Sequence, residues 1–119
     1  AELEWIRETV KDPLFADAPV KVAVMHIPAL RTPGSWYAQA WLNENFVPVL
    51  NEAGVGLMLS GHHHQHIYVK PEECGNSFPI IANDDTDRLE FEADADGWRI
   101  RTYDMSGTQT HAYDSTTIE

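Results

Sequence analysis

The first part of the chain alternates between helix-like and strand-like patterns of apolar residues. Apolar residues at helical spacing predict an amphipathic helix over residues 2–11, which Pro13 closes. The residues on its apolar face are Leu3, Ile6 and Val10. The run VKVAVM at 20–25 is short and rich in β-branched residues, which is typical of a buried strand.

A second helix and a second strand follow after a loop that contains several helix-breaking residues. Asn43 or Asn45 is a candidate N-cap, Pro48 is tolerated in the first turn, and Gly54 marks the C-terminal stop. The run VGLMLS at 55–60 is the next apolar, strand-sized segment. The order helix, strand, helix, strand favours parallel strands joined by helical crossovers.

The second half changes to the two-residue alternation of antiparallel strands. These strands are predicted at 78–82, 87–93, 98–103 and 109–113. ADADG at 93–97 is a hairpin turn in which Gly97 is suited to a positive φ. The whole chain, 1–119, is therefore predicted to be a single unit of the α/β class, in which a strand-helix-strand is followed by an antiparallel meander that gives the C-terminal half α+β character.

Composition limits the classes of partner. Apolar residues make up 43% of the chain, which is ordinary for a globular protein, and no apolar run approaches the ~20 residues of a membrane-spanning helix. The formal net charge is -11, from 8 basic and 19 acidic residues, and the basic residues form no cluster. A nucleic-acid-binding patch is therefore not expected. The sequence fixes no compartment, and an extracytoplasmic one is compatible with it.

Candidate chemistry is concentrated in the segment 60-SGHHHQH-66, which holds four of the six histidines. Neutral imidazole is a good ligand for transition metals. If the segment is extended, His62 and His64 point to the same side and converge on one site, whereas His63 points elsewhere. His26 follows the first predicted strand and would lie close if the two strands pair.

These considerations predict a metal site made by His26, His62 and His64. His63 and His66 are candidates for a supporting role around the ligands, and a plain surface position is an alternative for His66. His111, in a late predicted strand, is expected to be structural.

The arrangement resembles the C-terminal half of the calcineurin-like metallophosphoesterases, the group that includes purple acid phosphatases. The matching segments are 22-VAVMHIP-28 and 55-VGLMLSGHHH-64, in which a strand ends in an isolated histidine and a later strand runs into GHxH. The opening helix, 2-ELEWIRETV-10, and the strand-turn-strand LEFEADADGWRIRTYD also fit. The resemblance covers nearly all of the chain.

The resemblance implies a layered α/β/β/α sandwich with two divalent or trivalent metal ions (Fe, Mn or Zn) at the strand ends. It implies that His26 and His62 bind one metal and that His64 binds the other. In such enzymes the ions hold the phosphate of a mono- or diester and activate a water for in-line attack. The ions would also supply the positive potential that a chain of net charge -11 lacks.

The chain departs from the family in lacking its earlier motifs, DxH, GDxxD and a GNH-type segment. Those motifs carry the remaining ligands, including the bridging carboxylate, and the histidine that assists the leaving group. The resemblance therefore implies the C-terminal half of a longer domain, with no catalytic residue of its own and with little or no activity in isolation. Such a piece is expected to expose a sheet edge and apolar faces, and hence to self-associate.

A non-enzymatic role is the alternative. The three histidines could form a self-contained site in a metal-storage module, or the chain could offer a mating surface to another protein. Metal analysis and a phosphatase assay of the chain distinguish these alternatives from a segment of an enzyme.

Overall fold

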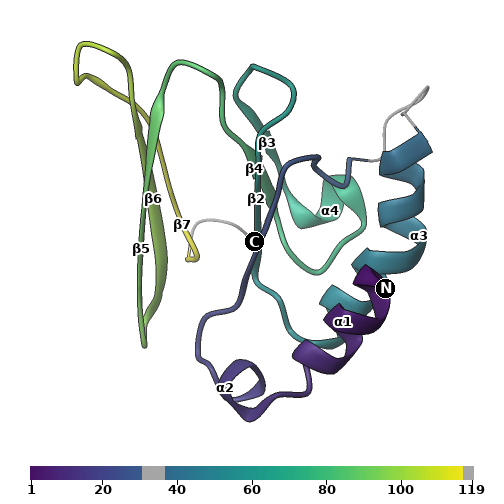
Figure 1. The fold of residues 1–119 in the computed structure, drawn as a ribbon. Helices are drawn as coiled ribbons and strands as arrows, with labels where there is room; N and C mark the ends of the chain where they lie inside the picture. The colour runs from purple at the N-terminus through teal and green to yellow at the C-terminus, as the bar shows by residue number, and fades with distance from the viewer. Residues whose placement is uncertain (31–36, 117–119) are drawn as a thin grey trace.

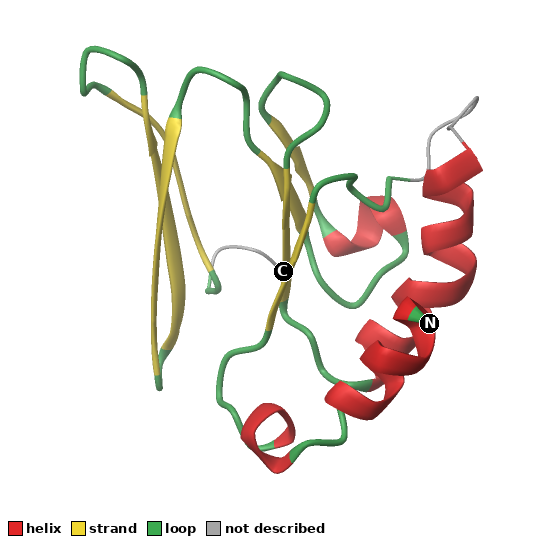
Figure 2. Cartoon of the chain, viewed as in Figure 1, coloured by secondary structure: helices red, strands yellow, loops and turns green. Residues whose placement is uncertain are grey.

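The computed structural model describes residues 1–30 and 37–116, so residues 31–36 of the predicted loop lie outside the described residues. The described chain is mixed α/β, with two sheets (Figure 1) (Figure 2). Helices α1, α3 and α4 lie on one side of the first sheet, and the second sheet lies on the other (Figure 1). In chain order the elements are α1 (Glu2–Thr9), α2 (Pro13–Ala16), β1 (Val22–Met25), α3 (Tyr37–Glu52), β2 (Leu57–Ser60), β3 (Ile67–Val69), α4 (Pro71–Cys74), β4 (Ile80–Ala82), β5 (Arg88–Asp94), β6 (Gly97–Tyr103) and β7 (Gln109–Asp114).

The first sheet, sheet A, has the strand order β1-β2-β4-β3. β1, β2 and β4 run parallel, and β3 runs antiparallel to β4. The predicted parallel pairing of the first two strands is confirmed, with Met25 level with Ser60 at their carboxyl ends. Helix α3 forms the crossover between them.

The strand predicted at 78–82 does not belong to the antiparallel meander. Its ordered part, β4, lies in sheet A, parallel to β2. The chain reaches it through β3 and α4, which the sequence pattern does not predict. A strand of 3 residues and a helix of 4 are too short to give a periodic signal, so the pattern alone joins this strand to the ones that follow it.

The second sheet, sheet B, is the predicted antiparallel meander, with the order β5-β6-β7. The hairpin between β5 and β6 turns where the sequence predicts it, and Gly97 has a φ of +135°, which other residues rarely adopt. Tyr113 of β7 packs on Tyr68 of β3 with ring centroids 4.4 Å apart. Sheet B therefore faces sheet A with β7 over β3 and with β5 towards β1.

Helix α1 confirms the predicted amphipathic helix, although it ends at Thr9. Its apolar face packs against the core, as its periodicity predicts. Pro13 does not close this helix but begins α2, because a proline is well accepted at the first helical position, where no N–H is needed. Asp12 caps α2 by accepting a hydrogen bond from the backbone N–H of Leu14 at 2.9 Å.

Helix α3 is continuous where the sequence predicts a helix beginning at a new cap. Asn43 and Asn45, the predicted N-cap candidates, lie inside it, and their side-chain amides donate to backbone carbonyls four residues earlier. Pro48 also lies inside the helix rather than in its first turn. An interior proline leaves a carbonyl without its usual partner, and the burial of Val47 and Leu50 on either side offsets this cost.

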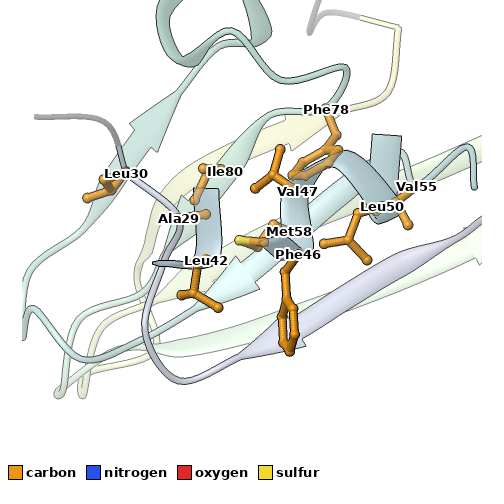
Figure 3. Packing of buried hydrophobic residues seen from close by; sticks show 10 residues of the cluster. All are labelled: Ala29, Leu30, Leu42, Phe46, Val47, Leu50, Val55, Met58, Phe78 and Ile80. Carbon is orange, nitrogen blue, oxygen red and sulfur yellow. The ribbon is translucent and has the colours of Figure 1, made fainter. Parts of the chain in front are cut away.

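The core consists of two apolar clusters, one on each face of sheet A. The cluster between sheet A and the helices contains buried Ala29, Leu30, Leu42, Phe46, Val47, Leu50, Val55, Met58, Phe78 and Ile80 (Figure 3). The cluster between the two sheets contains buried Leu57, Ile81, Trp98 and Ile100. Successive residues of a strand point to opposite faces, which is why neighbouring Leu57 and Met58 belong to different clusters.

β1 is an edge strand of sheet A, and the prediction that it is buried is wrong. Val24 is 78% exposed, and Phe91 of β5, the edge strand of sheet B, is 39% exposed. The residues paired with them, Leu59 and Ile100, pack in the cluster between the sheets. The space between the two sheets is therefore open along the side of β1 and β5.

One carboxylate organises the turn between β6 and β7. Oδ1 of Asp104 accepts hydrogen bonds from the hydroxyl and the backbone N–H of Ser106, at 2.6 and 2.9 Å, and from the backbone N–H of Thr108 at 3.0 Å. These bonds, that from the Ser106 hydroxyl first, hold the pKa of Asp104 below its usual value.

Replacing Asp104 by alanine should therefore lower the thermal midpoint of unfolding by a few degrees at neutral pH. A depressed carboxyl pKa stabilises the fold above the unfolded-state value of about 4 and ceases to do so as the pH falls through the folded-state value. The difference between wild type and Asp104→Ala should thus shrink below about pH 4. Thermal melts at neutral and acidic pH measure it, and a difference that grows on acidification would contradict this assignment.

Candidate metal centre

Two histidines follow the carboxyl ends of neighbouring parallel strands. His26 follows β1 directly, and His62 follows β2 after Gly61. The backbone continues the pairing beyond the strands, because the N–H of Gly61 donates to the carbonyl of His26 at 3.1 Å. The prediction that both histidines lie at the ends of paired strands is confirmed. Open α/β sheets bind their ligands at this kind of edge.

The imidazole rings of His26 and His62 are in contact. Nε2 of His26 lies 3.1 Å from Nδ1 of His62, and the ring planes are at 86°. Two imidazole nitrogens bound to one zinc ion at about 2.0–2.1 Å would lie roughly 2.8–3.4 Å apart for angles of about 90–110° at the ion. The spacing therefore fits two ligands of one metal ion, and it equally fits a hydrogen bond between the two rings.

The histidine loop, residues 61–66, is not the extended segment that the sequence predicts. His62 has a φ of +72° and His64 a φ of +56°, both in the left-handed region. For residues other than glycine this conformation costs about 1–2 kcal/mol each. The expectation that His62 and His64 share a side because they are two residues apart on an extended chain is therefore wrong in its premise. Strained backbone of this kind clusters at functional sites.

His63 is directed towards α3. Its Nε2 lies 3.2 Å from the side-chain nitrogen of Gln39, which also donates to the carbonyl of Pro28 at 3.3 Å. Gln39 is buried, and because an amide nitrogen donates, the ring nitrogen of His63 accepts. This contact ties the histidine loop to the helix layer, and nothing in the sequence pattern singles out Gln39.

His64 lies on the exposed side of the loop. Its Nδ1 is 3.7 Å from a carboxylate oxygen of Asp85, and both side chains are more than half exposed. As an ion pair this contact is weak, but imidazole and carboxylate are both donor types that bind Fe, Mn and Zn. Asp85 follows β4, the strand beside β2. Assigning this strand to sheet A from the sequence would have identified Asp85 as a candidate donor.

His66 faces sheet B instead of the other loop histidines. Its Nε2 lies 2.8 Å from the hydroxyl oxygen of Tyr113, and its ring stacks on His111 at a centroid distance of 3.6 Å. His111 and Tyr113 are two residues apart in β7 and share one face of the strand. The sequence predicts that they share a face, but it contains no signal that this face meets the histidine loop.

The surroundings favour the neutral form of two loop histidines. Partial burial lowers the pKa of His62 below its usual value, and repulsion from His26 and the neighbouring loop histidines lowers it further. Burial also lowers the pKa of His66, followed by the effect of His111. A neutral imidazole is the form that binds a metal ion.

The donors group into pairs. The structure brings His26 together with His62 and places His64 beside Asp85. Across residues 1–30 and 37–116, no three histidine, cysteine, aspartate or glutamate side chains are grouped so as to hold one metal ion. Structural zinc sites use four ligands and catalytic ones three, so a complete site here would need ligands from another segment.

The sequence was compared with protein-family models and with curated proteins. The sequence matches no protein-family model, and none of the curated proteins matches it significantly. The resemblance to metallophosphoesterases therefore stays a prediction from the sequence. No helix in the described parts of the chain combines the length and the apolar character that a membrane span requires.

Proposed function

We propose that this chain is the C-terminal segment of a dinuclear metal-dependent phosphoesterase that hydrolyses phosphate mono- or diesters. The observation that carries the proposal is the 3.1 Å contact between Nε2 of His26 and Nδ1 of His62 at the ends of paired parallel strands. In this assignment His26 and His62 hold one ion and His64 holds the other. The chain itself supplies no catalytic acid, base or nucleophile.

Bound Fe, Mn or Zn ions would polarise the phosphoester and lower the pKa of a coordinated water. The chain's own contribution is to present unprotonated imidazoles in fixed positions. The lowered pKa of His62 keeps its ring neutral, and His63 holds the loop against Gln39. A chain of net charge -11 repels a phosphoester, so local positive charge at this edge is a requirement for binding.

The layer order supports a place in an α/β/β/α sandwich. Helices, sheet A and sheet B are stacked in this order, which corresponds to three of the four layers (Figure 1). Both sheets are open along β1 and β5, where Val24 and Phe91 are exposed. A segment carrying DxH, GDxxD and GNH could extend both sheets on this side and bring the missing carboxylates to the strand ends.

The same open side supports self-association of the chain on its own. The outer edge of β1 presents backbone N–H and C=O groups, and its sequence VAVM carries no charge. A second copy could pair its own β1 along this edge and cover Val24. No charged side chain of the strand opposes such pairing.

The alternative of a self-contained three-histidine module has less support. It requires His64 to join His26 and His62 on one ion, whereas no three such side chains are grouped in this way within residues 1–30 and 37–116. A tightly bound ion at one equivalent in the chain alone would favour this module over the phosphoesterase.

Hydrolysis assays of the complete gene product and of the 119-residue chain, with p-nitrophenyl phosphate and its diester, test the proposal. We expect activity in the complete product that is lost on chelation and in His62→Gln, and little or none in the chain alone. A complete gene product without DxH, GDxxD and GNH motifs would overturn the proposal. So would activity that survives both chelation and the His62 substitution.

A further inference from the structure

A second cluster of polar rings lies where the histidine loop meets sheet B. His66, at the end of the loop, stacks on His111 of β7 with ring centroids 3.6 Å apart and planes at 7°. Its Nε2 lies 2.8 Å from the hydroxyl oxygen of Tyr113, also in β7. The proposed metal chemistry makes no use of this cluster.

Tyr113 is the polar anchor of His66. Nδ1 of His66 is buried and has no hydrogen-bond partner within the described residues, so the bond to Tyr113 is the one hydrogen bond of its ring there. Burial, followed by the effect of Tyr68, raises the pKa of Tyr113, so the group remains a phenol at neutral pH. Loss of this hydroxyl would leave both ring nitrogens of His66 unpaired within the described chain.

A chain of hydroxyl groups holds the face of β7 that touches His66. Nδ1 of His111 lies 3.1 Å from the hydroxyl of Thr102, which lies 2.6 Å from the hydroxyl of Thr110. That hydroxyl in turn donates to Asp87 at 2.8 Å. Thr102 is fully buried, so its two bonds are partly shielded from water and fix the ring of His111 relative to sheet B, whereas the bond from Thr110 to Asp87 is exposed.

The histidine loop requires an anchor at this end. The left-handed residues His62 and His64 give it a conformation that the chain would leave if it were released. On the helix side the loop is held by the contact of His63 with Gln39. On the other side it runs into β3, which has only 3 residues and so provides few backbone hydrogen bonds.

We propose that Tyr113 and His111 are positioning residues, which hold His66 and thereby fix the loop that presents His62 and His64. Sheet B then has a part in a site whose ligands come from the strand ends of sheet A. The consequence for metal binding rests on the proposed function, whereas the consequence for the loop itself does not.

The test compares Tyr113→Phe with Tyr68→Phe. The Tyr68 ring lies 4.4 Å from that of Tyr113, and its hydroxyl makes no hydrogen bond within the described residues, so the control removes a hydroxyl from the same cluster without affecting His66. Amide hydrogen exchange in residues 61–66 should become about five- to tenfold faster in Tyr113→Phe and change less than about twofold in Tyr68→Phe. Exchange in the β5–β6 hairpin should stay the same in both.

Equal acceleration in the two variants, or none in Tyr113→Phe, would overturn the proposal. If Tyr113→Phe does not fold, NMR of the wild type decides instead. We expect a slowly exchanging Tyr113 hydroxyl proton with a nuclear Overhauser effect to the His66 ring, and its absence would also overturn the proposal.

Titration with Zn²⁺ tests the link to the ligands. Affinity should fall about three- to tenfold in Tyr113→Phe and remain unchanged in Tyr68→Phe. Unchanged affinity in a variant with a loosened loop would overturn the link from His66 to His62 and His64. A wild type that binds no Zn²⁺ would show that His26 and His62 hold an ion only together with ligands from another segment, and the exchange experiment would then decide the role of Tyr113.

Discussion

Replacing His62 by glutamine should weaken Zn²⁺ binding to the chain by about 100-fold or more. Loss of a group that only supports a metal ligand costs about 10–100-fold in affinity, so loss of a ligand should reach at least the upper end of that range. Of the two contacting histidines, His62 is the one replaced. Its ring lies within the histidine loop, with its centroid 5.3 Å from that of His63. Glutamine keeps the length and polarity of the side chain but supplies no imidazole nitrogen.

The measurement is NMR of the imidazole side chains during a Zn²⁺ titration. In the wild type the signals of His26 and His62 should shift together, because their nitrogens lie 3.1 Å apart and would bind the same ion. In His62→Gln the response of His26 should move to about 100-fold higher metal concentration. This coupling is the specific signature of a shared ion.

His64→Gln is the matched control for this experiment. It removes a histidine from the same loop, but one whose Nδ1 lies beside Asp85, so the joint response of His26 and His62 should persist at the same metal concentration as in the wild type. If His64→Gln abolishes that response as fully as His62→Gln does, the three histidines act on one ion, and the assignment of His64 to a different ion is wrong.

The positions of the candidate ligands along the chain could be predicted because they depend on local patterns. The apolar runs that become β1 and β2 end at Met25 and Ser60, and the helical pattern between them implies a crossover and therefore parallel strands. Parallel pairing brings carboxyl ends to one edge, and with them His26 and His62. The proximity of the two histidines follows from this topology, whereas their contact at 3.1 Å also depends on the left-handed backbone of His62.

The surroundings of the ligands could not be predicted because they depend on contacts between distant segments. Gln39 and His63 are 24 residues apart, and His66 and Tyr113 are 47 apart. No local pattern encodes such pairs. The left-handed backbone of the histidine loop could not be predicted either. Glycine is the residue that usually marks a positive φ, and His62 and His64 adopt one without it.

The sequence pattern assigns β4 to the meander instead of sheet A for the same reason. Its apolar run is indistinguishable from that of an antiparallel strand, and only the chain path through β3 and α4 decides its partner. That path also determines which residues reach the site, because Asp85 follows β4 and comes beside His64 only when β4 lies next to β2. Misplacing one short strand therefore conceals one candidate donor.

Replacing Val24 by glutamate should prevent the self-association that is proposed for the chain. In the proposed pairing of two β1 edges, Val24 lies within an apolar contact, and its side chain is 78% exposed in the single chain. An unpaired charge buried there costs several kcal/mol, so the dissociation constant should rise by at least about 100-fold. Light scattering or sedimentation over a range of concentrations measures the change.

Met105→Glu provides the control for charge. Met105 is 88% exposed in the turn after β6, so this variant also exchanges an exposed apolar side chain for a carboxylate and makes the net charge more negative by the same amount. It should associate like the wild type, because it lies away from the edge of β1. If both variants become monomers, general repulsion explains the result, and if the wild type is already a monomer at high concentration, the open side of the sheets does not pair with a second copy.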